Sequence, residues 1–196
     1  MAYINEPSHI PLFLRFSIWI AERKVGNTLH AARILAWYPK AALGAGLLES
    51  LVAHKEGKVT KRLLKLIRMQ VSFMASCPFC IDLNSQEFSN ENITEIEIEA
   101  LQGKHSLKDV KTILEEERIT LEFTKSLTST PISINEENLI LMKQTFSERE
   151  FIVISSTVAQ VNFWTRMIQG IGVPPVGFTE KCSVLNLTEY QTLKKH

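Results

Sequence analysis

Residues 58–88 read KVTKRLLKLIRMQVSFMASCPFCIDLNSQEF, and this stretch decides the fold. Its first half carries apolar residues at helical spacing on most sides of the helix: Leu63, Leu64, Leu66, Ile67, Val71, Phe73 and Met74. Thr60 precedes this run, and its side-chain oxygen can accept a hydrogen bond from the first helical turn. The pattern predicts a helix that begins after Thr60, ends near Ala75 and lies at the centre of the core.

The motif Cys77-Pro78-Phe79-Cys80 follows directly. Proline suits the first position of a helix, and we expect this helix to extend to about Phe88. Cys77 then lies at the helix start and Cys80 in the first turn, where unpaired N–H groups and the helix dipole favour a thiolate. In such a pair, one sulfur can attack a peroxide or a disulfide and the other can resolve the product.

The same helix predicts a shared face. At about 100° per residue, Cys77, Cys80, Asn84 and Glu87 lie on one side, which offers two thiols, an amide and a carboxylate. A C-x-x-C pair can also be half of a zinc site, or two inert buried cysteines. The sequence contains neither a second C-x-x-C nor an H-x-x-x-H motif, so zinc is disfavoured, and we expect no metal and no cofactor.

The rest of the chain predicts an all-α protein with one domain spanning residues 1–196. Capping boxes stand at 94–97 and 147–150. We expect an N-terminal helical arm over about 1–57 and a polar C-terminal tail over about 179–196. Further helices are predicted over residues 11–24, 39–57, 94–103, 107–128, 135–143 and 147–170.

The composition is that of an ordinary globular protein and excludes several classes of partner. Of 196 residues, 45% are hydrophobic and 22% are charged, and the net charge is +1. Such a balance provides no strong field to attract nucleic acid or an anionic membrane. The apolar runs are shorter than the ~20 residues of a membrane span, and the first residues lack the basic start of a signal peptide. We therefore expect a cytoplasmic protein, in a compartment where cysteines stay mostly reduced.

The stretch 58–88, with its C-P-F-C-I-D turn, resembles the core of the carboxymuconolactone decarboxylase-like superfamily, and most of all the branch of the alkyl hydroperoxidase AhpD. Residues 146–175, with Asn162, Arg166 and the ending Gly-Val-Pro-Pro, resemble the closing helix of that family, and residues 11–39 fit its N-terminal arm. The resemblance implies an all-α, homo-oligomeric fold. It also implies a thiol-dependent peroxidase or disulfide oxidoreductase that acts on a small peroxide or disulfide and needs an external dithiol donor.

The resemblance assigns roles residue by residue. It makes Cys80 the attacking thiol and Cys77 the resolving one. The family's proton relay has a glutamate where this chain has Lys65, a histidine where it has Phe79, and a second histidine where it has Asn84. An amide forms hydrogen bonds but does not carry a proton near neutral pH.

These departures leave two functions open. In the first, Asn84 orients the nucleophile, Lys65 tunes its charge if it faces the pair, and Glu87 is a substitute base or a solvated carboxylate. In the second, the protein is a non-enzymatic redox-responsive or scaffold protein on the same fold. Cys182, in the polar tail, is a further thiol that could approach the site of a neighbouring subunit. The tryptophans are expected in the core or in an interface: Trp19, Trp37 and Trp164.

Overall fold

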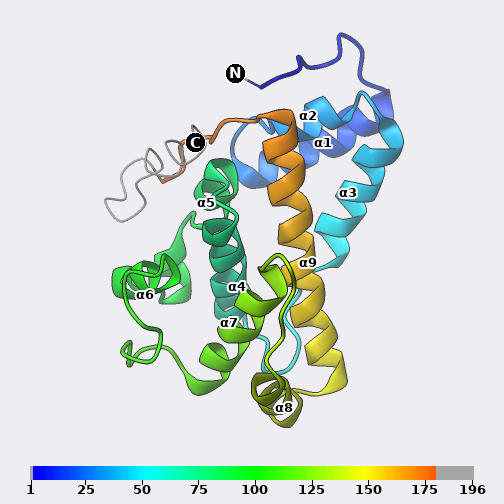
Figure 1. Ribbon diagram of the computed structural model, residues 1–196. Coiled ribbons are helices and arrows are strands. Elements are labelled where there is room, and N and C mark those ends of the chain that lie inside the picture. The colour runs from blue at the N-terminus through cyan, green and yellow to red at the C-terminus, as the bar shows by residue number, and fades with distance from the viewer. Residues whose placement is uncertain (1, 180–196) are drawn as a thin grey trace.

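The computed structural model describes residues 2–179, and the regular secondary structure within them is helical (Figure 1). The β-structure in this range is one bridge between Glu56 and Val59. The elements are α1 Leu12–Val25, α2 His30–Leu35, α3 Pro39–Leu51, α4 Lys61–Met74, α5 Pro78–Asn84, η1 Phe88–Glu91, α6 Glu95–Leu101, α7 Glu115–Thr128, α8 Glu136–Thr145 and α9 Glu148–Ile171. The fold class is therefore all-α, as the sequence predicts.

Helix α4 lies at the centre, as its apolar pattern predicts. The Oγ1 of Thr60 accepts a hydrogen bond from the backbone N–H of Leu63, at 3.1 Å, and so begins the helix. Helices α5, α6, α7 and α9 all pack against it. Because these neighbours cover it on most sides, its broad apolar surface is used inside the monomer.

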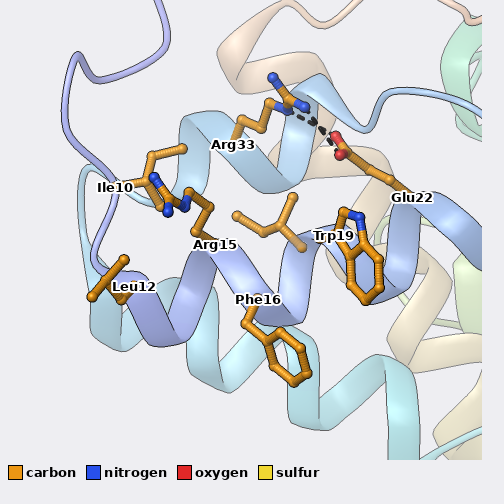
Figure 2. A pocket seen from close by; sticks show the side chains of 8 residues that line it. Ile10, Leu12, Arg15, Phe16, Trp19, Glu22 and Arg33 are labelled. Atoms are coloured by element: carbon orange, nitrogen blue, oxygen red, sulfur yellow. Dashed lines mark hydrogen bonds and ion pairs between the residues drawn. The ribbon is translucent and has the colours of Figure 1, made fainter.

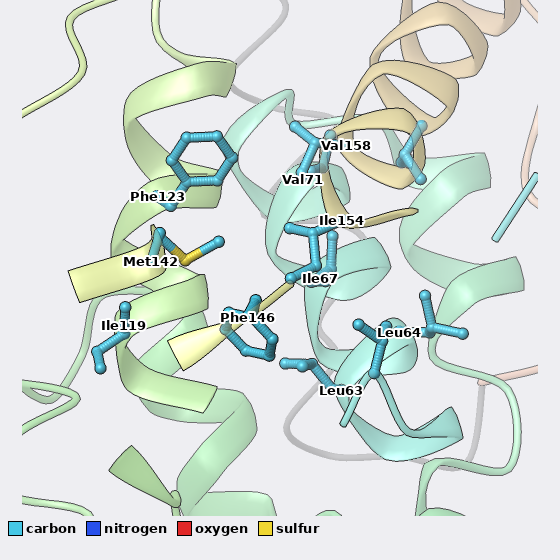
Figure 3. Packing of buried hydrophobic residues seen from close by; sticks show 12 residues of the cluster. Leu63, Leu64, Ile67, Val71, Ile119, Phe123, Met142, Phe146, Ile154 and Val158 are labelled. Carbon is cyan, nitrogen blue, oxygen red and sulfur yellow. The ribbon is translucent and has the colours of Figure 1, made fainter. Parts of the chain in front are cut away.

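The main core lies between α4, α7, α8 and α9 (Figure 3). Ile67 of α4 and Ile154 of α9 are completely buried there, and Phe123 of α7 and Met142 of α8 close the other side. The run Ile152-Val153-Ile154 is helical, because the capping box at Ser147 and Glu150 begins α9 before it. The apolar period of a helix thus prevails over the β-branched composition.

Arg62 joins three helices at the start of α4. Its Nη2 donates to Glu97 of α6 at 2.6 Å, and its Nε donates to Glu117 of α7 at 2.8 Å. Both carboxylates are buried, and each also accepts the backbone N–H of the residue before its helix, at Thr94 and Leu114. This end of α4 is therefore held by a polar network in which Arg62 and two backbone N–H groups bind the two buried carboxylates.

Helices α1 to α3 form an arm that lies across one end of α9 (Figure 1). Helix α1 turns an apolar face to solvent, because it packs on the rest of the arm through Leu14 and Ile18. Its exposed side chains include Leu12, Phe16, Trp19 and Ile20. No helix among residues 2–179 has the length and the hydropathy needed to cross a membrane.

The main differences from the sequence prediction are one additional helix and three helix boundaries. Helix α2 was not predicted, and α3 ends at Leu51 rather than near residue 57. The segment before α7 forms turns, and the helix begins only at Glu115, where Glu117 caps it. Helix α5 ends at Asn84, before the predicted end near residue 88, because the backbone turns into η1 with Glu87 in the left-handed region at φ 51°. The predicted tail from residue 180 onward, including Cys182, lies outside the described residues.

Candidate functional site

The two cysteines lie at the start of α5, as their motif predicts. Cys77 is the N-cap residue, and its Sγ accepts a hydrogen bond from the backbone N–H of Cys80 at 3.4 Å. Ser76 makes the turn from α4 with φ 47°, and the N–H of Cys77 donates to the carbonyl of Ser72 at 3.2 Å. This turn places the Cys77 sulfur over the first turn of the helix, beside Cys80.

Both thiols are buried in an apolar cluster. Cys77 is 0% exposed and Cys80 is 3% exposed. The buried partners of the pair come from four parts of the chain: Ala31 and Ile34 of α2, Phe79 of α5, Ile168 of α9, and Val173. The site is therefore completed by segments from both ends of the chain, and it excludes bulk water in this conformation.

Asn84 lies one helical turn beyond Cys80, and its amide is held on the side of α4. Its Nδ2 donates to the Oγ of Ser72 at 2.9 Å, and its Oδ1 accepts the Nε of Arg68 at 3.1 Å. The hydroxyl of Ser72 in turn donates to the Arg68 carbonyl at 2.7 Å. The amide therefore ties α5 to α4 beside the cysteine pair.

Arg68 continues this chain of contacts to the arm. Its Nη2 donates to Oε1 of Glu49 on α3 at 2.9 Å. The other oxygen of Glu49 accepts the Nε2 of Gln160 and the Nε1 of Trp164, each at 2.9 Å. Trp164 also packs against the cluster that contains the cysteines. One carboxylate of the arm is thus connected to the site by two routes.

Lys65 lies elsewhere than the charge-tuning role requires. Its Nζ donates to the backbone carbonyl of Gln86, beyond the C-terminal end of α5. Burial lowers the pKa of Lys65, and the nearby carboxylates of Glu91 and Glu87 oppose that effect. The described contacts of Lys65 therefore lie at the opposite end of α5 from the cysteines. Glu87 is also off the predicted helical face, because α5 ends before it.

Asp82 is a second anchor on the cysteine helix. Its side chain is fully buried, and its Oδ2 accepts the backbone N–H groups of Val176 and Gly177 at 2.8 and 2.7 Å. Its Oδ1 accepts both the N–H and the hydroxyl of Thr179, at 2.9 and 2.8 Å. This carboxylate holds the segment after α9 against α5, and Val176 packs on the cysteine cluster.

A polar hollow of about 380 Å³ borders the same turn. Ala75, two residues before Cys77, lines it, and its carbonyl accepts the Nε2 of Gln169 at 3.0 Å. Asn162 and Arg166, which belong to the closing-helix pattern, line it as well, with the Nη1 of Arg166 on the Oδ1 of Asn162 at 2.8 Å. Within residues 2–179, no group of three histidine, cysteine or acidic side chains could hold a metal ion.

The structure brings together three of the four predicted site residues: Cys77, Cys80 and Asn84. It also adds residues that the sequence did not indicate as part of the site. Glu49 stood out only as a charge that interrupts an apolar run, and its partners on α9 lie more than a hundred residues later. Nothing in the local sequence pointed to Arg68 or to Asp82 as partners of distant segments.

Comparisons with known proteins agree with this architecture. No family model matches the chain. The uncharacterized protein YnjA of Escherichia coli (strain K12) is 19% identical over 170 residues, which are 87% of this chain and 92% of YnjA. The uncharacterized protein YdfG of Bacillus subtilis (strain 168) is 24% identical over 119 residues, which are 60% of this chain and 79% of YdfG.

Solved structures show the same fold over most of the chain. An uncharacterized peroxidase-related protein from Ralstonia eutropha JMP134, described as an alkylhydroperoxidase AhpD core, superposes with a TM-score of 0.76 at 18% identity, covering 90% of this chain and 94% of that one. The debrominase Bmp8, in complex with 2,3,4-tribromopyrrole, superposes with a TM-score of 0.74 at 18% identity, covering 91% of each chain. The chain therefore has the fold of the alkylhydroperoxidase AhpD core.

Proposed function

We propose that this protein is a thiol-dependent oxidoreductase in which Cys77 and Cys80 pass between a dithiol and a disulfide while they reduce a hydroperoxide or a disulfide substrate. The observation that carries the proposal is the hydrogen bond from the N–H of Cys80 to the Cys77 sulfur, at 3.4 Å. It supports the proposal because it brings the Cys77 sulfur beside the backbone of Cys80, the residue with which the disulfide would form. A hydrogen bond to sulfur also favours its charged form.

The proposed reaction has three steps. The Cys80 thiol gives up its proton and its thiolate attacks a hydroperoxide. The O–O bond breaks, the leaving alkoxide takes up that proton and departs as an alcohol, and a sulfenic acid remains on Cys80. The Cys77 thiolate then attacks that sulfur, and water leaves as the disulfide forms. An external dithiol reduces the disulfide by exchange and becomes oxidised itself. The roles of the two cysteines follow the AhpD-like resemblance.

The surroundings of the pair shape the substrate class. The cluster around the thiols is apolar, and it includes Phe79 and Trp164. An organic hydroperoxide with an apolar body therefore fits it better than hydrogen peroxide does. The relay positions hold Lys65, Phe79 and Asn84, so general acid–base assistance worth about 10²–10⁴-fold is absent from those positions. We expect slow turnover.

The test is a comparison of disulfide formation and turnover in the full-length protein. Mild oxidation followed by thiol alkylation and peptide mass analysis should protect Cys77 and Cys80 together. Consumption of an organic hydroperoxide with several dithiol donors should be lost in Cys80→Ser and kept in the matched control Cys182→Ser. Recovery of both cysteines alkylated after oxidation would refute the proposal. A disulfide that forms without turnover would instead favour the redox-responsive function.

A second candidate reaction is reductive dehalogenation, and the structural likeness to a debrominase favours it. The same dithiol would donate two electrons to a carbon–bromine bond, so that the products are the disulfide, the dehalogenated compound and bromide with a proton. Adding 2,3,4-tribromopyrrole to the same assay decides between the two reactions. Bromide release that depends on Cys80 would favour dehalogenation, and peroxide consumption alone would exclude it.

We also propose that the chain forms a homo-oligomer through its arm. A groove of about 560 Å³ runs along α1, with apolar Leu12, Phe16 and Trp19 on its walls (Figure 2). The arm exposes five aromatic side chains to between 48% and 62%: Phe13, Phe16, Trp19, Trp37 and Tyr38. At ~150–250 Å² per aromatic side chain, these alone expose roughly 500 Å². With the neighbouring leucines, that approaches the ~800 Å² that each partner buries in a standard interface.

Light scattering tests the assembly. The wild-type protein should have at least the mass of a dimer at micromolar concentration, and Phe16→Ser with Trp19→Ser should reduce it toward the monomer mass. The matched control is Ile152→Ser, which removes an exposed apolar side chain from α9 instead of the arm. A wild-type monomer, or a dimer that only the control disrupts, would refute this interface.

A further inference from the structure

We propose that Glu49 and Arg68 are positioning residues that set the reactivity of the Cys80 thiol through Asn84, and that the arm thereby supplies the carboxylate that the relay lacks at position 65. The inference rests on the proposed function only in requiring that Cys80 is a reactive thiol. It assigns to a helix of the arm a part in the chemistry of a distant pair of cysteines.

The first step is that Glu49 is held in place although it is partly exposed. Its side chain is 47% exposed, yet its two oxygens accept hydrogen bonds from three side chains. Arg68 comes from α4, and Gln160 and Trp164 come from α9. A solvated surface glutamate has no such set of donors, so the carboxylate has a defined place at the border between solvent and the site.

The second step is the path from Arg68 to the thiol. The guanidinium binds Glu49 through Nη2 and Asn84 through Nε, at 2.9 and 3.1 Å. Asn84 follows Cys80 by four residues on α5, and residues at that spacing have their Cβ atoms about 5–6 Å apart. The positive charge therefore lies about one side chain away from Cys80, where it stabilises the thiolate, and Glu49 moderates that effect.

The third step concerns the other charges near α5, which have their own partners. Arg33 of α2 pairs with Glu22, and Asp82 of α5 accepts four hydrogen bonds from residues 176–179. The charged or titratable side chains on α2, α3, α4, α5 and α9, besides the cysteine pair, are His30, Arg33, Lys40, Glu49, Lys61, Arg62, Lys65, Arg68, Asp82, Glu148, Arg149, Glu150 and Arg166. Of these side chains, Arg68 is the one whose described hydrogen bonds include Asn84, one helical turn after Cys80 on α5.

The relay of the AhpD-like pattern gives this arrangement its chemical sense. That pattern has a carboxylate on the core helix and an imidazole at position 84. Here Asn84 stands where the pattern has the imidazole, and the guanidinium of Arg68 binds its amide. The carboxylate that binds Arg68 is that of Glu49 on α3. The carboxylate near the site therefore comes from the arm and not from the core helix. In this arrangement, the Glu49–Arg68 pair adjusts the stability of the Cys80 thiolate, whereas the relay of the AhpD-like pattern transfers a proton.

The experiment measures the pH dependence of Cys80 alkylation by iodoacetamide in the full-length protein, with labelling resolved by peptide mass. Glu49→Gln should lower the midpoint of labelling by about half to one pH unit, because it leaves Arg68 unopposed. Arg68→Gln should raise the midpoint by a similar amount. The double variant should return near the wild-type midpoint. Glu137→Gln, an exposed residue on α8, is the matched control and should change nothing.

Shifts of opposite sign in the labelling midpoint distinguish this role from a merely structural one. If the two substitutions only loosened the site, the midpoints of both single variants would shift in the same direction. Arg68→Lys keeps the charge, so its midpoint should stay closer to wild type than that of Arg68→Gln. Midpoints that shift together, or not at all, overturn the inference while the proposed function stands. A Cys80 thiol that resists labelling in the folded wild-type protein at every pH overturns both proposals.

Discussion

Two arginines of α4, six residues apart, show how one helix serves two purposes. Arg62 binds Glu97 and Glu117, whose side chains are 0% and 3% exposed. Arg68 binds Glu49, which is 47% exposed, and the neutral amide of Asn84. The first network is closed: one guanidinium binds two carboxylates that are buried away from water. The second reaches solvent at one end and the cysteine helix at the other.

The difference teaches where stability and reactivity are located. In the network of Arg62, both carboxylates also cap helices through backbone N–H groups, so every group has a structural purpose. In the network of Arg68, the carboxylate binds side chains, and these connect to α5 and to the cysteine cluster. We expect the closed network to fix the fold and the open one to adjust the charge beside Cys80.

The largest expected effect breaks the closed network. Arg62→Leu leaves Glu97 and Glu117 buried without their cation, and removing one partner of a buried pair costs about 3–5 kcal/mol. Urea denaturation should therefore show a large loss in the free energy of unfolding. If Arg62→Leu costs no more than Arg68→Leu, the distinction between the two networks is wrong.

The next effect concerns the anion that the cysteine helix itself buries. Asp82→Asn turns an acceptor of four hydrogen bonds into a group that places an N–H₂ against backbone donors. Hydrogen bonds to charged groups are worth about 1.5–3 kcal/mol each, so we expect a loss of about 2–3 kcal/mol and release of residues 176–179. Because Val176 covers the cysteine cluster, alkylation of Cys77 should accelerate in this variant. Unchanged labelling in a destabilised protein would show that the segment does not guard the pair.

A pH titration of stability sharpens the comparison further. Burial alone would raise the pKa of Glu97, but the bonds from Arg62 and from the N–H of Thr94 hold it below the ordinary 4.5. A lowered pKa means that the folded state binds fewer protons than the unfolded state, so this stabilisation is complete above pH 4.5 and is lost as the pH falls below it. The urea concentration at the midpoint of unfolding, measured between pH 7 and pH 3, should therefore decrease below about pH 4.5. The midpoint of the Glu97→Gln variant should decrease less steeply over the same range.

The smallest effect on stability is expected at Glu49. Exposed ion pairs contribute about 0–1 kcal/mol, so Glu49→Gln should change the free energy of unfolding by less than about 1 kcal/mol while it shifts the labelling of Cys80. The two readouts, urea denaturation and alkylation, would then separate a tuning residue from a structural one. A loss of several kcal/mol would place Glu49 in the same class as Arg62.

The local signals of the sequence predict much of the helical framework. Thr60, Thr94 and Ser147 begin helices as predicted, because a cap forms between residues three positions apart. The placement of Cys77 and Cys80 on the first turn of α5 is confirmed for the same reason. A helix cap depends only on residues that are close in the sequence, so it can be predicted without knowing the tertiary packing.

Features that depend on packing escaped prediction. Trp19 of α1 was expected in the core or in an interface, because an amphipathic pattern does not distinguish a core from a surface that a partner covers. The end of α5 depends on Glu87, whose backbone is in the left-handed region. Glutamate rarely adopts that conformation, so its presence in the sequence does not predict a turn. The partners of Glu49 on α9 lie far along the chain, so no local pattern could indicate them.

The cover of the cysteine pair has a consequence for biosynthesis. Ala31 and Ile34 are made before the pair, but Ile168, Val173 and the segment bound by Asp82 are made near the end of the described chain. At about 5–20 residues per second, a ribosome leaves the thiols uncovered for on the order of ten seconds. A nascent or truncated chain that lacks α9 presents both sulfurs to oxidants and metals, whereas the finished chain withdraws them. Translation thus passes through a period of chemical vulnerability that ends only when α9 docks.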